Sequence, residues 1–143
     1  RSRGLGDVYK RQHFDHVSPM ARSLGAKLIL EQIHRFNQTD PLPTIVMGDF
    51  NAKPNSKAVR IMRENLPGYR DVRLQDVYDF LDSMIGNTYH GFKGKITPKL
   101  KPIDYIFVSD DFEVVNASVD TTCYDGAYPS DHYPVSATLR LKS

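Results

Sequence analysis

The sequence predicts a mixed α/β fold (α+β) in one domain, with a sheet that has an antiparallel portion. Apolar residues recur at helical spacing in the first half of the chain and alternate every second residue in the last third. The chain has 143 residues, 40% of them hydrophobic, which is enough to form one buried core. No internal repeat or domain boundary interrupts this pattern.

The first expected helix begins after residue 18 and ends near residue 37. Ser18 followed by Pro19 is typical of an N-cap and a first helical turn. A broad apolar stripe at helical spacing follows, made of Leu24, Leu28, Ile29, Ile33 and Phe36. Residues 44–47 (TIVM) are a short continuous apolar run, which predicts a strand buried on both faces.

A second helix is expected after Asn55 or Ser56, either of which can cap it, and it ends before Pro67. Residues 69–87 are ambiguous; we expect a loop with a short helix around residues 76–84. Three strands follow. Residues 103–108 are almost wholly apolar, Val115, Ala117 and Val119 alternate with polar residues, and residues 133–141 alternate without a break.

Residues 1–12 (RSRGLGDVYKRQ) show neither helical nor strand periodicity, and they lack the apolar segment of a secretory signal. We expect a non-native or disordered leader, with the domain covering residues 13–143. Four basic residues and one acidic residue lie in this leader, so the net charge of +2 becomes −1 without it. Net charge therefore argues neither for nor against a polyanionic partner.

Composition excludes some classes of protein. No apolar run approaches the length of a membrane-spanning helix. The single cysteine, Cys123, excludes an intrachain disulfide framework and a cysteine zinc site, and it leaves the cellular compartment open.

Four polar sites interrupt the apolar segments. The first is Gly48-Asp49-Phe50-Asn51, directly after the strand at 44–47. Asp49 and Asn51 stand two residues apart and face the same side if the strand continues. They can therefore offer oxygens to Mg²⁺ or contact a phosphate. An Asx-turn that closes the strand is the structural alternative.

The second site is Asp104, which shares a strand face with Ile106 and Val108 and should be partly buried. A buried carboxylate is costly unless it is paired, so the sequence predicts a histidine or metal partner. A solvated position at the strand end is the alternative.

The third site is Ser130-Asp131-His132, before the last strand, and the fourth is His13, which is uninformative alone. A capped turn is the alternative for the third site. Lys93, Lys95, Lys99 and Lys101 lie in a loop that leads to Asp104. Such a charge run is usually a solvated loop. If Asp104 lines a site, these lysines stand at its rim and attract phosphate.

In combination, these motifs resemble the endonuclease/exonuclease/phosphatase (DNase I-like) superfamily. The motifs are His-Phe-Asp at 13–15, Gly-Asp-Phe-Asn at 48–51, Ile-Asp-Tyr-Ile-Phe-Val at 103–108 and Ser-Asp-His-Tyr-Pro-Val at 130–135. The resemblance runs from about residue 13 to residue 141. It implies the C-terminal half of a four-layer α/β sandwich, with a mixed, mostly antiparallel sheet and flanking helices.

The resemblance implies Mg²⁺- or Mn²⁺-dependent hydrolysis of a phosphate ester. By this resemblance, Asp49 orients or deprotonates the attacking water, Asn51 binds the phosphate near the metal, and Asp131 is a carboxylate on the metal side. Asp104 matches the partner of His132, which contacts the phosphate, and His13 matches a histidine on the opposite wall. Asp49 and Asn51 also count as metal-side groups, and substrate contacts are expected at Asn51, His90, Lys93 and Lys95. Proteins of this family use a glutamate ligand in an early strand; Glu31, Glu64 and Glu113 do not stand in that context.

Two other interpretations stay open. A non-catalytic binding module could keep the fold without metal chemistry, and a nucleic-acid-binding protein could use the lysine loop without a metal. Within the enzyme interpretation, the substrate could be nucleic acid, a phospholipid head group or a sugar phosphate. We expect no stable protein partner, and localisation is not predicted.

Overall fold

The computed structural model describes residues 8–81, 86–97 and 99–143. The helices are α1 (Pro19–Asn37) and α2 (Lys57–Arg63), with 3₁₀ turns η1 (Pro67–Tyr69) and η2 (Val77–Phe80). The strands are β1 (Val8–His13), β2 (Thr44–Asp49), β3 (Leu74–Asp76), β4 (Asp104–Ser109), β5 (Phe112–Val119) and β6 (Val135–Leu141). Within these ranges, no helix combines the length and the apolar character that crossing a membrane requires.

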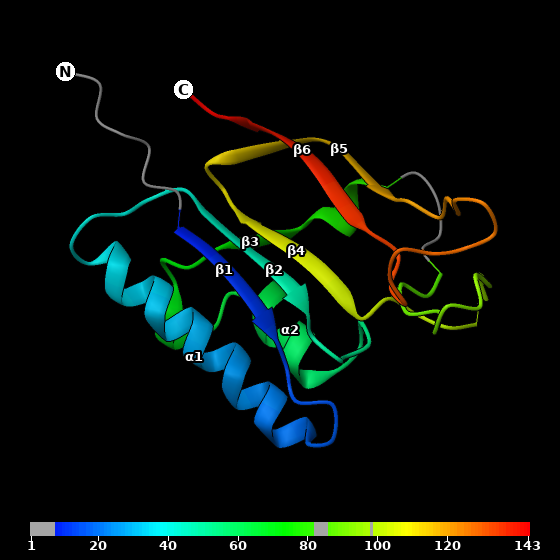
Figure 1. The fold of residues 1–143 in the computed structure, drawn as a ribbon. Coiled ribbons are helices and arrows are strands. Elements are labelled where there is room, and N and C mark those ends of the chain that lie inside the picture. The colour runs from blue at the N-terminus through cyan, green and yellow to red at the C-terminus, as the bar shows by residue number, and fades with distance from the viewer. Residues whose placement is uncertain (1–7, 82–85, 98) are drawn as a thin grey trace.

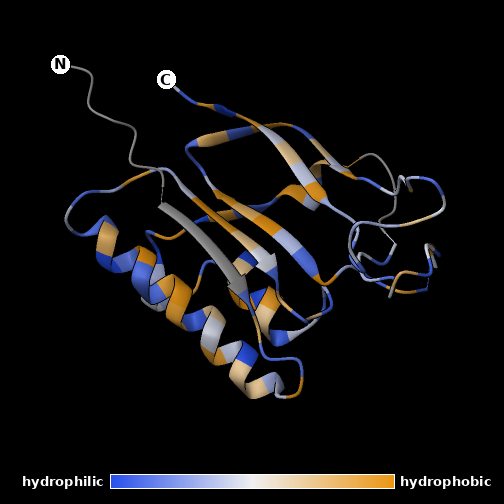
Figure 2. Ribbon diagram, viewed as in Figure 1, coloured by the Kyte–Doolittle hydropathy of each residue, from blue (hydrophilic) through white to orange (hydrophobic). Residues whose placement is uncertain are grey.

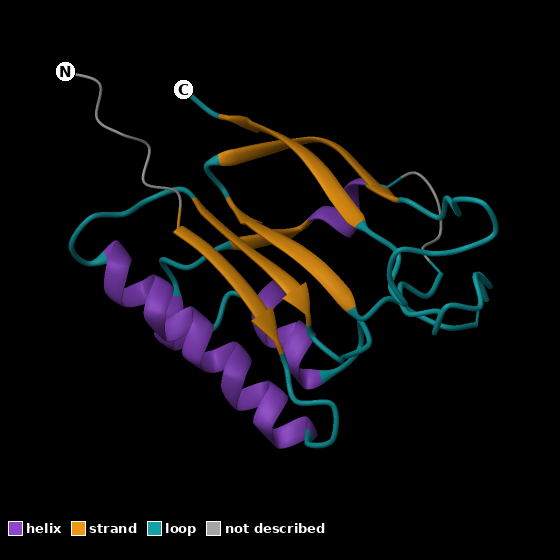
Figure 3. Cartoon of the chain, viewed as in Figure 1, coloured by secondary structure: helices purple, strands orange, loops and turns teal. Residues whose placement is uncertain are grey.

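The predicted α/β class with a mostly antiparallel sheet is confirmed. Four strands form one sheet in the order β1-β2-β4-β3, in which only the β1–β2 pair is parallel, and β5 and β6 form a second, antiparallel sheet. The two helices cover one face of the first sheet, and β5 and β6 lie over the other (Figures 1 and 3). Apolar residues of β2 and β4 alternate between these two layers: Val46 and Phe107 pack in the helix-side core, and Val108 packs with β5.

Helix α1 begins where the sequence predicts, because Ser18 Oγ accepts a hydrogen bond from Ala21 N at 3.2 Å. Its buried face differs from the predicted stripe. The buried residues are Ala26, Ile29, Leu30 and Ile33, which follow an i, i+3, i+4, i+7 pattern. Leu24 and Leu28 are exposed, and apolar and hydrophilic residues are interspersed along α1 (Figure 2).

The predicted alternation of β5 places Val115 on the same buried face as Ala117, and this prediction is wrong. The pairing of β5 with β6 shifts between Val114 and Asn116, which is the signature of a β-bulge. The extra residue reverses the alternation, so Val114 is buried and Val115 is exposed. Strict two-residue periodicity cannot anticipate this shift.

The expectation for the leader also differs from the structure. Residues 8–12 belong to β1, whose backbone pairs in parallel with β2 from Val8 opposite Thr44 to His13 opposite Asp49. Backbone pairing with an existing strand orders this segment even though its side-chain pattern carries no strand signal. The short helix expected at 76–84 is η2, and residues 82–85 lie outside the described part of the chain.

A buried ion pair joins α2 to β3. Asp76 is 1% exposed and accepts a hydrogen bond from Arg63 Nε at 3.0 Å, while its other oxygen accepts from Tyr78 N at 2.9 Å and caps η2. Burial raises the pKa of Asp76, against the lowering effects of these two partners.

Replacing Arg63 with Met should therefore lower the free energy of unfolding by about 2–3 kcal/mol, because it leaves a buried carboxylate without its cation. Urea denaturation measures the change. The double variant Arg63→Met/Asp76→Asn should recover part of the loss, since no buried charge remains. A loss below about 0.5 kcal/mol in the single variant, the level of an ordinary surface substitution, would contradict this account.

Candidate active site

Two carboxylates face each other across neighbouring strands at one end of the first sheet. Asp49 ends β2 and Asp104 begins β4, and the two residues are direct partners in the antiparallel register. Like charges at directly opposite positions destabilise a sheet. Burial raises the pKa of Asp49, and the negative charge of Asp104 raises it further, against a lowering hydrogen bond from Asn51 N. This end of the sheet therefore favours a cation or a proton.

The chain bends sharply after Asp49. Gly48 has a φ of 148° and Asn51 has a φ of 47°, and asparagine tolerates this left-handed region better than most residues. Asp49 Oδ1 accepts a hydrogen bond from Asn51 N at 2.8 Å, so the Asx-turn weighed as the structural alternative does form. Asn51 Nδ2 donates to Phe14 O at 2.8 Å. This bond fixes the amide, and the described part of the chain supplies no donor to its oxygen.

The predicted histidine partner of Asp104 is His132. His132 Nδ1 lies 2.8 Å from Asp104 Oδ2, and both side chains are largely buried. The contact orients the imidazole and leaves Nε2 as the ring nitrogen that another group can use. This pair comes from residues 28 positions apart, joined through the start of β4 and the segment before β6.

Asp49, Asp104 and His132 form a group whose donor atoms all lie within 4.8 Å of one another. His13 Nε2 lies 3.5 Å from Asp49 Oδ2, because His13 is the direct neighbour of Asp49 in the β1–β2 register; its side chain is 74% exposed. The carboxylate oxygens suit Mg²⁺ or Mn²⁺, whereas the imidazole is a ligand that other transition metals prefer. The mutual repulsion of the two carboxylates and the raised pKa of Asp49 make these residues fit such an ion.

Sequence reasoning missed Thr88 as a member of the site. Thr88 is fully buried, and its hydroxyl donates to Asp104 Oδ2 at 2.6 Å, the same oxygen that contacts His132. The hydroxyl oxygen also accepts from Ile103 N at 3.0 Å. A threonine in an irregular loop gives no sequence signal for such a contact, which depends on long-range packing.

The segment that contains Thr88 also holds His132 in place through its backbone. Tyr133 N donates to Thr88 O at 2.7 Å, and Tyr89 and His132 form an isolated antiparallel bridge. His90 N and Gly91 N both donate to Asp131 O, at 2.9 and 3.1 Å. The turn before β6 is therefore clamped on the segment at 87–91.

The other expected site residues have different positions. The His90 side chain is 7% exposed and is stacked on Tyr133 at a centroid distance of 4.1 Å, so the structure does not support its expected substrate contact. Lys93 and Lys95 are exposed in the adjoining loop. Asp131 is half-buried and adjoins His132, but its carboxylate is not a member of the Asp49, Asp104 and His132 group. Its role as a metal ligand stays a prediction.

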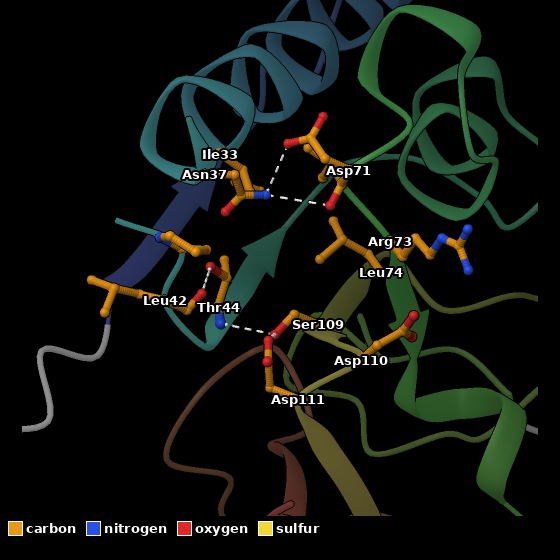
Figure 4. A pocket seen from close by; sticks show the side chains of 12 residues that line it. Ile33, Asn37, Leu42, Thr44, Asp71, Arg73, Leu74, Ser109, Asp110 and Asp111 are labelled. Atoms are coloured by element: carbon orange, nitrogen blue, oxygen red, sulfur yellow. Dashed lines mark hydrogen bonds between the residues drawn. The ribbon is translucent and has the colours of Figure 1, made fainter. Parts of the chain in front are cut away.

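Two cavities lie at opposite ends of β2 and β4. One of about 280 Å³ adjoins the site and is lined by Asp104 and His132 together with apolar residues that include Met47, Ile106 and Val135. The other, of about 240 Å³, lies at the start of β2 (Figure 4). Its polar groups bond to each other: Asn37 Nδ2 donates to Asp71 Oδ2 at 3.0 Å, and Thr44 N donates to Ser109 Oγ at 3.0 Å. The second cavity is therefore a structural feature of the helix–sheet junction.

Thr88→Val should lower kcat for the expected hydrolysis of a phosphate ester about tenfold. This is the lower end of the loss that follows when a residue that orients a metal-ligating side chain is replaced. The change removes one hydrogen bond from Asp104 Oδ2 and loosens His132. Imidazole NMR should then show His132 with a mixed tautomer. Thr88→Ser keeps the hydroxyl and should retain most activity and the single tautomer. Equal losses in both variants would indicate a packing role instead.

A scan against protein-family models gives the description Endonuclease/Exonuclease/phosphatase family for residues 2–132. The chain belongs to this family. The search of curated proteins found no match. Among solved structures, the family fold recurs in the mannosyl-6-phosphatase of Bacteroides thetaiotaomicron, which is 28% identical with a TM-score of 0.78. That match covers 93% of this chain and 51% of the phosphatase.

Two further solved structures share the fold of this endonuclease/exonuclease/phosphatase chain. A family protein from Bacteroides vulgatus is 28% identical with a TM-score of 0.76, over 96% of this chain and 51% of its own. TDP2 of D. rerio, complexed with a single-strand DNA product, is 16% identical with a TM-score of 0.63, over 92% and 55%. At that identity the likeness shows the fold alone. The chain thus spans about half the length of these solved structures.

Proposed function

We propose that this chain carries the phosphate-binding and acid–base half of a Mg²⁺- or Mn²⁺-dependent hydrolase of phosphate esters. One observation carries the proposal: facing carboxylates of Asp49 and Asp104 meet the imidazole of His132 at one end of the sheet. Membership in the endonuclease/exonuclease/phosphatase family supports it, as does the likeness to a mannosyl-6-phosphatase.

Asp49 is the base that orients and deprotonates the attacking water. Its raised pKa brings it closer to the value that suits a base near neutral pH. The half-buried position at the end of β2 keeps the carboxylate fixed, and the hydrogen bond from Asn51 N holds one oxygen. The other oxygen, Oδ2, lies beside His13 and is left for water or metal.

His132 contacts the phosphate through Nε2. Its Nδ1 lies 2.8 Å from Asp104 Oδ2, and this contact orients the ring so that Nε2 is left for a phosphate oxygen, whose negative charge develops during the reaction. Thr88 holds the same carboxylate oxygen. Asn51, with its amide fixed by Phe14 O, contributes a further polar group at the phosphate.

Asp49 and Asn51 would hold the metal ion, with Asp131 as the expected third group. When bound, Mg²⁺ or Mn²⁺ neutralises phosphate oxygens and stabilises the leaving oxygen. The donor set that the structure brings together also includes Asp104 and His132. A binding test with the metal alone can therefore distinguish these ligands.

The proposal is tested with two measurements on the chain. Mn²⁺ should broaden the NMR signals of Asp49, Asn51 and His132, and hydrolysis of a generic phosphodiester, a sugar phosphate, DNA and RNA should require Mg²⁺ or Mn²⁺ and stop with EDTA. Binding of phosphate esters without any metal effect on binding or hydrolysis would favour the non-catalytic binding module. The absence of both metal binding and phosphate binding at these residues would overturn the proposal.

A further inference from the structure

The segment at 87–91 presents an aromatic side chain that the proposed mechanism does not use. Tyr89 is 50% exposed, although Thr88 before it is fully buried and His90 after it is 7% exposed. Its ring centroid lies 5.1 Å from that of His132, with the planes inclined at 63°. An exposed aromatic ring therefore adjoins the imidazole that serves the phosphate.

Backbone contacts define the position of Tyr89. Its backbone bridges to His132, and its carbonyl accepts from Asn87 Nδ2 at 2.7 Å. Gly91 has a φ of 56°, and a Cβ added there would lie 3.2 Å from the Tyr89 hydroxyl oxygen. The ring is thus fixed between His132 and the Gly91 backbone, while half of its surface stays in water. Such a preorganised aromatic surface binds a ligand at low entropic cost.

Positive charge follows the ring along the chain. Lys93 N donates to His90 O at 3.0 Å, which closes a tight turn directly after the ring. The Lys93 and Lys95 side chains are exposed, and no carboxylate in the described ranges forms an ion pair with them. An aromatic ring next to cations suits a ligand that has both a ring and a phosphate.

We propose that Tyr89 is a specificity-determining residue that selects phosphate esters whose alcohol part contains a ring, as a sugar or a nucleoside does. The inference rests on the proposed function: the phosphate lies at His132, and the ring of the substrate packs against the exposed face of Tyr89. Lys93 and Lys95 attract the anionic substrate to this side of the site. An acyclic phosphate ester has no ring to pack on Tyr89 and gains nothing from it.

The test compares mannose 6-phosphate and a deoxynucleoside 5′-phosphate with glycerol 3-phosphate. Tyr89→Ala should weaken binding of the ring-bearing esters about tenfold, within the range measured for loss of one stacking aromatic, and leave glycerol 3-phosphate unchanged. Tyr89→Phe should match the wild type, because no described residue bonds to the Tyr89 hydroxyl. Phe36→Ala removes a half-exposed aromatic at the far end of α1 and should change nothing.

Calorimetric binding in the presence of Ca²⁺, together with KM and kcat in Mg²⁺, keeps this proposal separate from the proposed function. If Tyr89→Ala weakens cyclic and acyclic esters equally, the ring only positions His132, and the specificity role is wrong. If it changes neither, the ring does not contact substrate. Absence of metal binding at Asp49 and Asn51 would count against the proposed function, while the binding ratios would still decide the role of Tyr89. A tenfold effect on only one cyclic ester identifies which of the two the site accepts.

Discussion

In a protein that contains both halves of the domain, replacing His132 with Ala should lower turnover of a phosphate ester at least ~10²-fold, the usual contribution of a general acid–base group. The variant removes the imidazole that contacts Asp104 Oδ2 at 2.8 Å and leaves that largely buried carboxylate with Thr88 as its remaining side-chain partner. Steady-state kinetics at saturating Mg²⁺ measures the loss. Since His132 acts on the reacting phosphate, kcat should fall more than KM rises.

The chain offers a matched control for this experiment. His34 Nδ1 lies 2.6 Å from Asp71 Oδ1, which repeats the histidine–aspartate pair on α1, near the opposite end of the sheet. His34→Ala should leave turnover unchanged and affect stability only. Equal activity in the His132 and His34 variants would refute the assignment of the site.

The elements that the sequence predicts well are those whose signals are local. Helix α1 has its cap at Ser18 and its proline in the first turn, and both act within four residues. A partner for Asp104 was also predictable, because a carboxylate flanked by strand residues needs one when buried, whereas His132 as that partner came from the family resemblance. The cap of α1 and the need for a partner at Asp104 both follow from a few neighbouring residues, although His132 itself lies 28 positions away.

The features that the sequence does not predict depend on contacts between distant segments. Strand β1 is ordered by pairing with β2, and the bulge at Val115 depends on the register between β5 and β6. Thr88 reaches Asp104 only when the loop at 87–91 packs against the start of β4. His90 illustrates the same limit: it lies within the expected motif, yet stacking on Tyr133 buries it, and Tyr89 is the exposed neighbour.

Replacing Asp49 with Asn should change activity and stability in opposite directions. Turnover should fall at least ~10²-fold, because the amide cannot accept a proton from the attacking water. In metal-free buffer at pH 7 the melting temperature should rise. The folded-state pKa of Asp49 is raised by burial and by Asp104, so its ionised form destabilises the fold, and the neutral amide removes that cost.

The pH dependence gives the sign of this effect. A carboxyl group whose pKa is raised on folding contributes stability at pH values below its pKa in the unfolded chain. This contribution is lost as the pH rises through its pKa in the folded protein. The stabilisation by Asp49→Asn should therefore vanish below about pH 3.8, the ordinary pKa of this group.

Mg²⁺ should raise the melting temperature of the wild type and not of the variant, since a bound cation offsets the negative charge of the ionised Asp49 carboxylate. Asp120→Asn is the control, because its exposed carboxyl has a pKa lowered by Thr122 and should give no stabilisation. A wild type that is more stable than Asp49→Asn at pH 7 without metal would contradict this account. It would show that ionised Asp49 stabilises the fold and that repulsion between the two facing carboxylates costs no stability.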